Sequence, residues 1–428
     1  MTFLVLGVTA VFLLGGVGIA YVIGAGSVLG FIAAGQDIYL AVLPQRIFSQ
    51  LDLFALMALP LFILTGEIMN RSGITRVIVN LMMALVGRVK GGLGHANILT
   101  SVFFGGVSGS AIADTAALSN TLVPAMVERG YRRSYAAALT AASSIIGPII
   151  PPSIILILYG ALMETSVTAL FVAGIVPGLL LAASLMVANA ICARREDHRE
   201  ENEKDDPVLS RSIIAALPAL SLPVIILGGI VGGVTTPTEA AAIAVVAALI
   251  VGSRQDGMNA QIFWQAVQTT VRLTGSVFMI LAAVAVFGYL AGLLQWPQSL
   301  AGWVSGTGLS GLELLLAINL LFLVVGMVLD LPVALFLIVP VIAPLALAQG
   351  VDPTHLGIVL CFNLCIGLTP PPFGACLAVT ASVAGVEYKK IARAVLTFVA
   401  AEILVLGCLI LFPQISLFLP RLAGFVAG

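Results

Sequence analysis

Two apolar stretches of the sequence are interrupted in the same way, by the segment IGPIIPPS at residues 146–153 and by IGLTPPPF at residues 366–373. A proline has no N–H group to donate, and its ring clashes with the preceding turn of a helix. Neither stretch can therefore continue as one regular helix. The two segments lie 220 residues apart, so the sequence predicts two broken helices at corresponding places of a duplicated chain.

The 220-residue offset extends beyond these two breaks. It places Pro124 on Pro344 and Gly130 on Gly350 without a gap. One clearly hydrophilic segment, ARREDHREENEKDDP at residues 193–207, lies near the middle of the chain and predicts a solvated linker. The predicted parts are a first repeat at residues 1–192, a linker at residues 193–211 and a second repeat at residues 212–428.

The composition predicts an integral membrane protein. Of the 428 residues, 60% are apolar and 9% are charged, whereas soluble domains contain about 45–50% apolar and about 25% charged residues. The apolar runs are continuous, which predicts membrane-spanning helices rather than the alternating strands of a β-barrel. The lipid bilayer is therefore the first partner that we expect.

The sequence argues against several other classes of protein. A net charge of -1 excludes a basic surface for nucleic acid. The sequence contains no P-loop and no nucleophile–base pair near a histidine, so we expect no enzyme, no bound nucleotide and no organic cofactor. The five cysteines form no CxxC pair with a nearby histidine, which argues against a zinc site.

Two apolar runs, at residues 94–127 and 309–347, are too long for one span, and each has helix-breaking residues near its middle. The first contains GGVSGSAIAD at residues 105–114 and the second GMVLDLP at residues 326–332. An irregular tip is tolerated inside a membrane only where protein or a cavity surrounds it. We predict one re-entrant hairpin in each half. The broken spans that follow the hairpins cover residues 134–163 and 356–385.

Each half is then predicted to contain about five spans and one hairpin, in an all-α polytopic fold. An odd number of spans inverts the second repeat relative to the first. With the central linker in the cytoplasm, 17 of the 19 Lys and Arg residues face the cytoplasm and only Arg46 and Arg421 lie outside, as the positive-inside rule requires. Amphipathic stretches at about 38–50 and 258–273 predict interfacial arm helices, separate from the spans.

Inverted repeats with interrupted helices are typical of secondary transporters, which hold substrate and ions near the bilayer midplane. Unwound carbonyl groups suit Na⁺, and a half-helix N-terminus suits an anion. Asp114 and Asp330 lie at the hairpin tips, where each either biases a cation site or caps the following helix. Glu239 is interpreted as a first-turn acid favoured by the helix dipole. Ser108 and Ser110 make the first tip more polar than the second, so we expect the substrate to bind mainly against the first tip.

Four motifs resemble those of a known family in order and spacing: GGVSGSAIAD at 105–114, GPIIPPS at 147–153, GGVTTPTEAA at 232–241 and GLTPPPFG at 367–374. The family is the large membrane (M, DctM-like permease) subunit of tripartite ATP-independent periplasmic (TRAP) transporters. The resemblance covers essentially the whole chain. It implies an elevator-type architecture of the ion-transporter superfamily, in which a transport domain carrying both hairpins moves against a scaffold.

The same resemblance implies two sodium sites and a substrate site between the hairpin tips. The first sodium site corresponds to Ser108, Gly147, Ile150 and Pro152. The second corresponds to Gly326, Gly367, Thr369, Pro370 and Phe373. The expected substrate-binding residues are Ser108, Gly109, Ser110, Asp114 and Asp330. The 220-residue offset relates Gly147 to Gly367, so the two predicted sodium sites also correspond by the repeat.

The function implied by the resemblance is Na⁺-coupled import of organic acids across the bacterial inner membrane. Substrates of the family are mostly carboxylates, commonly C4-dicarboxylates or sialic acid, delivered by a periplasmic binding protein (P). The small four-helix subunit (Q) is expected as a separate chain, because nothing here precedes the first shared span. Two Na⁺ ions would offset the charge that an anion brings into a low dielectric.

Two other functions stay open on the sequence. A stand-alone Na⁺- or H⁺-coupled anion symporter would use the same architecture without a binding protein. An ion channel or a structural membrane scaffold would lack saturable, sodium-dependent uptake. The hairpin tips contain no arginine that could clamp a carboxylate, so the sequence does not select one organic acid.

Overall fold

The computed structural model describes residues 15–87, 89–195, 209–254 and 258–426, together with residues 7, 11 and 12. Within these residues, every regular element is an α-helix or a short 3-10 helix. Seven helices are long and apolar enough to cross a membrane, and five shorter apolar helices accompany them. The predicted all-helical, polytopic fold is therefore confirmed. Most of the predicted linker falls outside the described residues.

Each of the two long apolar runs forms a helix, a short tip and a second helix. The first pair is α6 (Gly92–Ser108) and α7 (Ala111–Glu128), and the second is α15 (Gly311–Val328) and α16 (Leu331–Ala348). The first tip turns at Gly109, which has a φ of +58°. A Cβ there would also lie 3.1 Å from the carbonyl oxygen of Pro152. Only glycine combines this backbone conformation with so close an approach.

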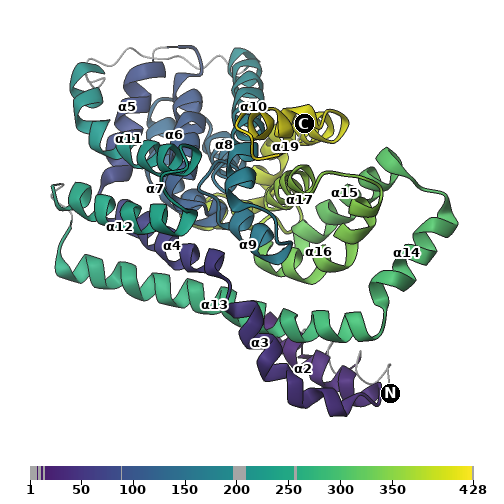
Figure 1. Cartoon of the computed structure of the whole chain (residues 1–428). Helices are drawn as coiled ribbons and strands as arrows, with labels where there is room; N and C mark the ends of the chain where they lie inside the picture. Colours follow the sequence, from purple (N-terminus) through teal and green to yellow (C-terminus); the bar gives the residue numbers. More distant parts are fainter. Residues whose placement is uncertain are drawn as a thin grey trace.

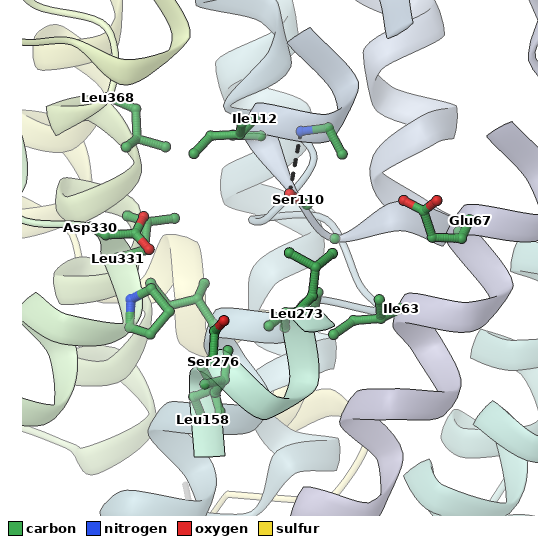
Figure 2. A pocket seen from close by; sticks show the side chains of 18 of the residues that line it. Ile63, Glu67, Ser110, Ile112, Leu158, Leu273, Ser276, Asp330, Leu331 and Leu368 are labelled. Carbon is green, nitrogen blue, oxygen red and sulfur yellow. Dashed lines mark hydrogen bonds between the residues drawn. The ribbon is translucent and has the colours of Figure 1, made fainter. Parts of the chain in front are cut away.

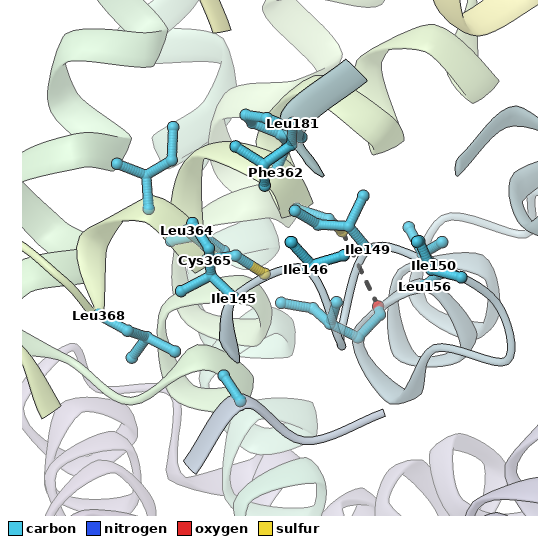
Figure 3. Close-up of a cluster of buried hydrophobic side chains, with 14 of the residues drawn as sticks. Ile145, Ile146, Ile149, Ile150, Leu156, Leu181, Phe362, Leu364, Cys365 and Leu368 are labelled. Carbon is cyan, nitrogen blue, oxygen red and sulfur yellow. Dashed lines mark hydrogen bonds between the residues drawn. The ribbon is translucent and has the colours of Figure 1, made fainter. Parts of the chain in front are cut away.

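Each of the two proline-rich spans consists of two half-helices. The first consists of α8 (Arg133–Ser144) and α9 (Ile154–Leu162), and the second of α17 (Pro353–Gly367) and α18 (Ala375–Ala384). The second half-helix of each span packs against helices of the other half of the chain. Thus α9 contacts α16 and α17, and α18 contacts α7 and α8. Residues from the first break, Ile145 and Ile146, lie beside Cys365 of α17 (Figure 3). The two predicted repeats thus share one core.

Close backbone contacts hold the hairpins against the broken spans. A Cβ on Gly105 of α6 would lie 2.6 Å from the Cα atom of Gly147. A Cβ on Gly326 of α15 would lie 3.2 Å from the carbonyl oxygen of Leu364 in α17. Lipid is as apolar as the helix surfaces, so helices in a membrane associate through this kind of tight van der Waals packing rather than through hydrophobic burial.

The remaining helices surround this core (Figure 1). They are α2 (Ile19–Ala33), η1 (Asp37–Val42), α3 (Leu43–Leu51), η2 (Phe54–Met57), α4 (Ala58–Arg71), α5 (Ile74–Val86), α10 (Val167–Arg195), α11 (Leu209–Val231), α12 (Pro237–Ser253), α13 (Ala260–Leu293), α14 (Trp296–Thr307), α19 (Tyr388–Leu411) and α20 (Gln414–Leu422). In Figure 1, α13 runs along one edge of the molecule, and it contacts α2, α3, α4 and α16.

The structure differs from the sequence prediction at α13. We predicted an interfacial arm at 258–273 and a separate span after it, but both form one continuous helix of 34 residues. The helix begins at a cap, where the side chain of Asn259 accepts a hydrogen bond from the N–H of Ile262 at 2.8 Å. No proline follows before Leu293, so nothing in the backbone requires a break between the arm and the span.

Glu239 belongs to a capping box at the start of α12, which confirms its interpretation as a first-turn acid. Its carboxylate accepts hydrogen bonds from the N–H and the hydroxyl of Thr236, at 2.8 and 2.9 Å. The hydroxyl of Thr236 in turn accepts from the N–H of Glu239 at 3.3 Å. Such reciprocal bonds satisfy N–H groups that a helix start otherwise leaves unpaired.

Replacing this cap should lower stability without affecting transport. We expect Thr236→Ala to destabilise the protein by about 1 kcal/mol, because it removes the side-chain partner of the Glu239 N–H. Thermal unfolding of the purified protein should show a lower midpoint. The control is Val234→Ala, since Val234 is 80% exposed and should tolerate the change. Equal midpoints for the two variants would contradict this role of the capping box.

Candidate functional site

A cavity of about 360 Å³ lies where the two hairpin tips meet α4 and α13. The first tip contributes Gly109, Ser110 and the start of α7, and the second contributes Asp330 and the start of α16. Figure 2 shows Ser110 between the carboxylates of Asp330 and Glu67. Further lining residues are Ile63, Asn70, Ile154, Leu158, Leu273, Ser276, Val277 and Leu368. The cavity is therefore mostly apolar, with a few polar groups from several elements, as ligand sites usually are.

Three of the predicted substrate residues meet in this cavity, namely Gly109, Ser110 and Asp330. Ser110 is the N-cap residue of α7, and its hydroxyl accepts a hydrogen bond from the N–H of Ala113 at 3.4 Å. The side chain of Ser108 falls outside the described part of the chain. Asp114 is fully buried, and its carboxylate lies against Gly147, so that a Cβ on this glycine would collide with it. The structure thus places Asp114 beside the first break rather than in the cavity.

The sequence left two interpretations open for Asp114 and Asp330, namely a contribution to a cation site or a helix cap. The structure tests the second of these. Asp330 occupies the N-cap position of α16 but makes no side-chain capping hydrogen bond. Its carboxylate instead faces the cavity (Figure 2). In the first hairpin the cap is Ser110, and Asp114 lies in the first turn of α7. Capping therefore explains neither acid.

The first predicted sodium site lies at the turn between α8 and α9. The carbonyl oxygen of Gly147 would normally bond the N–H four residues later, but Pro151 has none. In the described residues, no N–H or hydroxyl group bonds the carbonyl oxygens of Gly147, Ile150 or Pro152. Buried carbonyls are rarely left unpaired. Three such oxygens at one turn suit Na⁺, which unwound backbone carbonyls bind in transporters.

The second predicted site repeats this chemistry at the turn between α17 and α18. Pro371 cannot donate to the carbonyl oxygen of Gly367, which lies four residues before it. Among the described residues, the carbonyl oxygens of Gly326, Gly367 and Thr369 accept no hydrogen bond, whereas that of Pro370 accepts one from Gly374 at 3.1 Å. The side chain of Phe373 is 64% exposed. Three carbonyl oxygens of the predicted site are therefore available to bind a cation. The carbonyl oxygen of Pro370 is the one that already accepts a hydrogen bond.

Sequence reasoning gave no role to Glu67, yet this residue lines the cavity. Its carboxylate forms an ion pair with Arg71, with 2.9 Å between Oε2 and Nε. The guanidinium of Arg71 also donates to Gln265 and Thr269 of α13, at 3.3 and 3.1 Å. Only the i,i+4 spacing of Glu67 and Arg71 was visible in the sequence. The partners on α13 are almost 200 residues away, so the contact between α4 and α13 could not be foreseen.

Glu402 of α19 was also given no role. It is fully buried, and its Oε2 atom lies 2.7 Å from the hydroxyl of Thr369, a member of the second predicted sodium site. In the sequence, an isolated acid in an apolar run does not indicate which residue it will contact.

The sequence matches the family described as "Tripartite ATP-independent periplasmic transporter, DctM component" over residues 6–415. It is 39% identical to the sialic acid TRAP transporter large permease protein SiaM of Vibrio cholerae, over 88% of this chain and 89% of that protein. It is 35% identical to the C4-dicarboxylate TRAP transporter large permease protein DctM of Pseudomonas aeruginosa, over 89% of each chain. The isethionate TRAP transporter permease protein DctMQ of Oleidesulfovibrio alaskensis is 34% identical, over 99% of this chain and 66% of that protein.

One solved structure, that of the YdaH transporter of Alcanivorax borkumensis, resembles the fold with a TM-score of 0.62. The likeness covers 92% of this chain and 90% of that one, at 16% sequence identity. At this identity the likeness concerns the fold alone.

Proposed function

The chain belongs to the DctM component family of tripartite ATP-independent periplasmic transporters, and from this premise we propose that it is the large permease subunit of a Na⁺-coupled importer of an organic acid. As a member of that family it is a multi-pass membrane transporter permease and not an enzyme. One observation carries the finer proposal. The cavity between the hairpin tips is flanked by two proline-broken turns. At these turns the carbonyl oxygens of Gly147, Ile150, Pro152, Gly367 and Thr369 accept no hydrogen bond from the described residues.

The cavity suits a carboxylate through its backbone. Both α7 and α16 begin at its wall, at Ala111 and Leu331. Each helix N-terminus carries a partial positive charge and N–H groups that attract an anion. Ser110 adds a hydroxyl, and Asp330 supplies an acceptor for substrate hydroxyl or amino groups. A free carboxylate beside Asp330 is unfavourable unless cations are close, which is the reason to couple its entry to Na⁺.

The names of several relatives support the proposed substrate class. The sialic acid and C4-dicarboxylate permeases described above are two of them, and the 2,3-diketo-L-gulonate TRAP transporter large permease protein YiaN of Escherichia coli, 35% identical to this chain, is a third. The substrates in these three names are carboxylates, whereas the isethionate named for a fourth relative is a sulfonate. Because three of the four names specify a carboxylate, we propose a carboxylate substrate for this chain. We further propose an elevator movement of the hairpin-bearing core against α4 and α13, in the bacterial inner membrane, with the central linker in the cytoplasm.

The partners that we propose are a periplasmic substrate-binding protein and a small membrane subunit. The isethionate relative supports the second of these. Its name combines M and Q, and this chain covers 66% of its length, which leaves room for a further segment there.

Uptake into proteoliposomes tests the proposed function. Vesicles should contain this chain and its small subunit, and radiolabelled sialic acid or a C4-dicarboxylate should be offered on its binding protein. We expect uptake of one substrate only with an inward Na⁺ gradient and the binding protein, and loss of uptake in Ser108→Ala. Uptake of free substrate without a binding protein would instead favour a stand-alone symporter. Conductance without saturable uptake would favour a channel.

A further inference from the structure

Glu402 is an acid buried in a membrane-spanning helix without a basic partner. It lies 14 residues after the first residue of α19, which is about 21 Å along the helix axis. Its side chain is fully buried, and no Lys, Arg or His in the described residues forms an ion pair with it. Acids at this depth are costly, by about 2.5–3.5 kcal/mol on insertion scales, and they usually have a function.

The hydrogen bonds around Glu402 leave one oxygen without a partner. Oε2 lies 2.7 Å from the hydroxyl oxygen of Thr369, and that hydroxyl also lies 2.8 Å from the carbonyl oxygen of Ile366. A hydroxyl group has a single hydrogen, so Thr369 can donate to only one of these acceptors. Oε1 is buried and has no hydrogen-bond partner among the described residues. A buried acceptor in this situation requires a donor or a cation.

The surroundings of Glu402 are rich in negative charge density. Thr369 follows the C-terminal end of α17, where the helix dipole places partial negative charge. The carbonyl oxygens of Gly367 and Thr369 are the unbonded ones described above. At the N-terminus of α18, the N–H of Cys376 is bonded to the carbonyl oxygen of Leu368 at 3.0 Å, so it does not serve as a donor to Glu402. A cation would therefore be more favourable here than a further hydrogen bond.

We propose that Glu402 is the charged member of the second sodium site and sets its affinity for the cation. This inference rests on the proposed function and deepens it. One carboxylate balances one monovalent cation, and the hydroxyl of Thr369 and the backbone carbonyls complete a set of oxygen ligands. The charge balance selects Na⁺ over a divalent ion, which would leave a net positive charge in a low dielectric.

At the first predicted sodium site, the nearby carboxylate belongs to a helix in a different part of the fold. There Asp114 of α7 lies against Gly147. The 220-residue offset carries Asp114 onto Ala334 and carries Glu402 back onto Ala182. The two carboxylates are thus unrelated by the repeat, yet each lies beside one broken turn. The repeat in the sequence therefore gives no indication of Glu402.

A neutral carboxyl group is the competing explanation. It would donate to Thr369, and Thr369 would donate to Ile366, which forms a chain of hydrogen bonds without a cation. Glu402→Gln separates the two explanations, because the amide keeps the volume and the donor but cannot carry the charge. The matched control is Glu313→Gln, since Glu313 is an exposed first-turn acid of α15.

The experiment measures the thermal unfolding of the purified full-length chain as Na⁺ replaces choline at constant ionic strength. A ligand that binds only the folded state raises the unfolding temperature by mass action. We expect the Na⁺ concentration for half-maximal stabilisation to rise at least about tenfold in Glu402→Gln and to stay unchanged in Glu313→Gln. This readout needs neither the binding protein nor transport activity.

The outcomes distinguish the inference from the function on which it rests. If Na⁺ fails to stabilise the unaltered protein, the proposed Na⁺ coupling fails. If the unaltered protein responds and Glu402→Gln responds at the same Na⁺ concentration, the carboxylate is a structural hydrogen-bond donor and our inference is wrong. Should Glu402→Gln not purify, Glu402→Asp replaces it, because a carboxylate withdrawn by one methylene group should also weaken the Na⁺ response. An unchanged midpoint in Glu402→Asp would equally overturn the inference.

Discussion

Gly367→Ala is expected to abolish transport. A Cβ at this position would lie 2.7 Å from both the Cα and the carbonyl oxygen of Gly326. Backbone atoms cannot swing away as a flexible side chain can, so α15 and α17 would have to separate. The separation would displace two of the carbonyl oxygens predicted to bind Na⁺. Uptake in proteoliposomes should fall at least about a hundredfold.

A second glycine provides the control for this prediction. Gly407 lies in α19, and a Cβ there would meet nothing within 4 Å. Gly407→Ala should retain full uptake and gain up to about 1 kcal/mol of stability, because alanine favours a helix over glycine. If Gly367→Ala transports at the rate of Gly407→Ala, the contact between α15 and α17 is not needed for transport.

Asp330→Asn is expected to cause the other large loss. The carboxylate of Asp330 faces the cavity and does not cap α16, so its replacement should leave the helix intact. The substitution keeps the size of the side chain but removes its charge and one acceptor. A binding site that is built to form a hydrogen bond with its substrate works far less well when that bond cannot form. We expect uptake to fall about a hundredfold or more, measured at saturating Na⁺.

The thermal response to Na⁺ should survive in Asp330→Asn, because the broken turns remain unchanged. Asp37→Asn serves as the control, since Asp37 is an exposed acid in η1. Normal uptake in Asp330→Asn would remove Asp330 from the substrate site. Loss of the Na⁺ response together with uptake would assign Asp330 to cation binding instead.

Local chemistry explains which parts of the fold could be predicted from the sequence. Pro151 and Pro371 remove an N–H group wherever the chain is placed, so the broken spans were predictable. Gly109 allows a left-handed turn at the first hairpin tip, which a sequence also reveals. The continuous helix α13 was missed because amphipathicity indicates an interfacial surface but not a helix end. A helix end requires a cap or a breaker, and α13 has its cap at Asn259.

The candidate site was predictable only where its residues lie close together in sequence. Ser110 and Gly109 belong to one motif, and Gly147, Ile150 and Pro152 to another. Glu67 and Glu402 were missed because their importance depends on contacts across the fold. Glu402 meets Thr369 from another helix, and apolar runs contain no periodic signal for a single pairing of this kind.

The packing of half-helices against the other half of the chain also has a consequence for biosynthesis. The first hairpin packs on α18, and α18 begins about 250 residues after α7 ends. At about 5–20 residues per second, a ribosome needs roughly 10 to 50 seconds for that length. During this interval the newly inserted first half lacks its partner, and its proline-broken turn is incompletely covered. The first hairpin therefore reaches its final packing only after α18 has been synthesised.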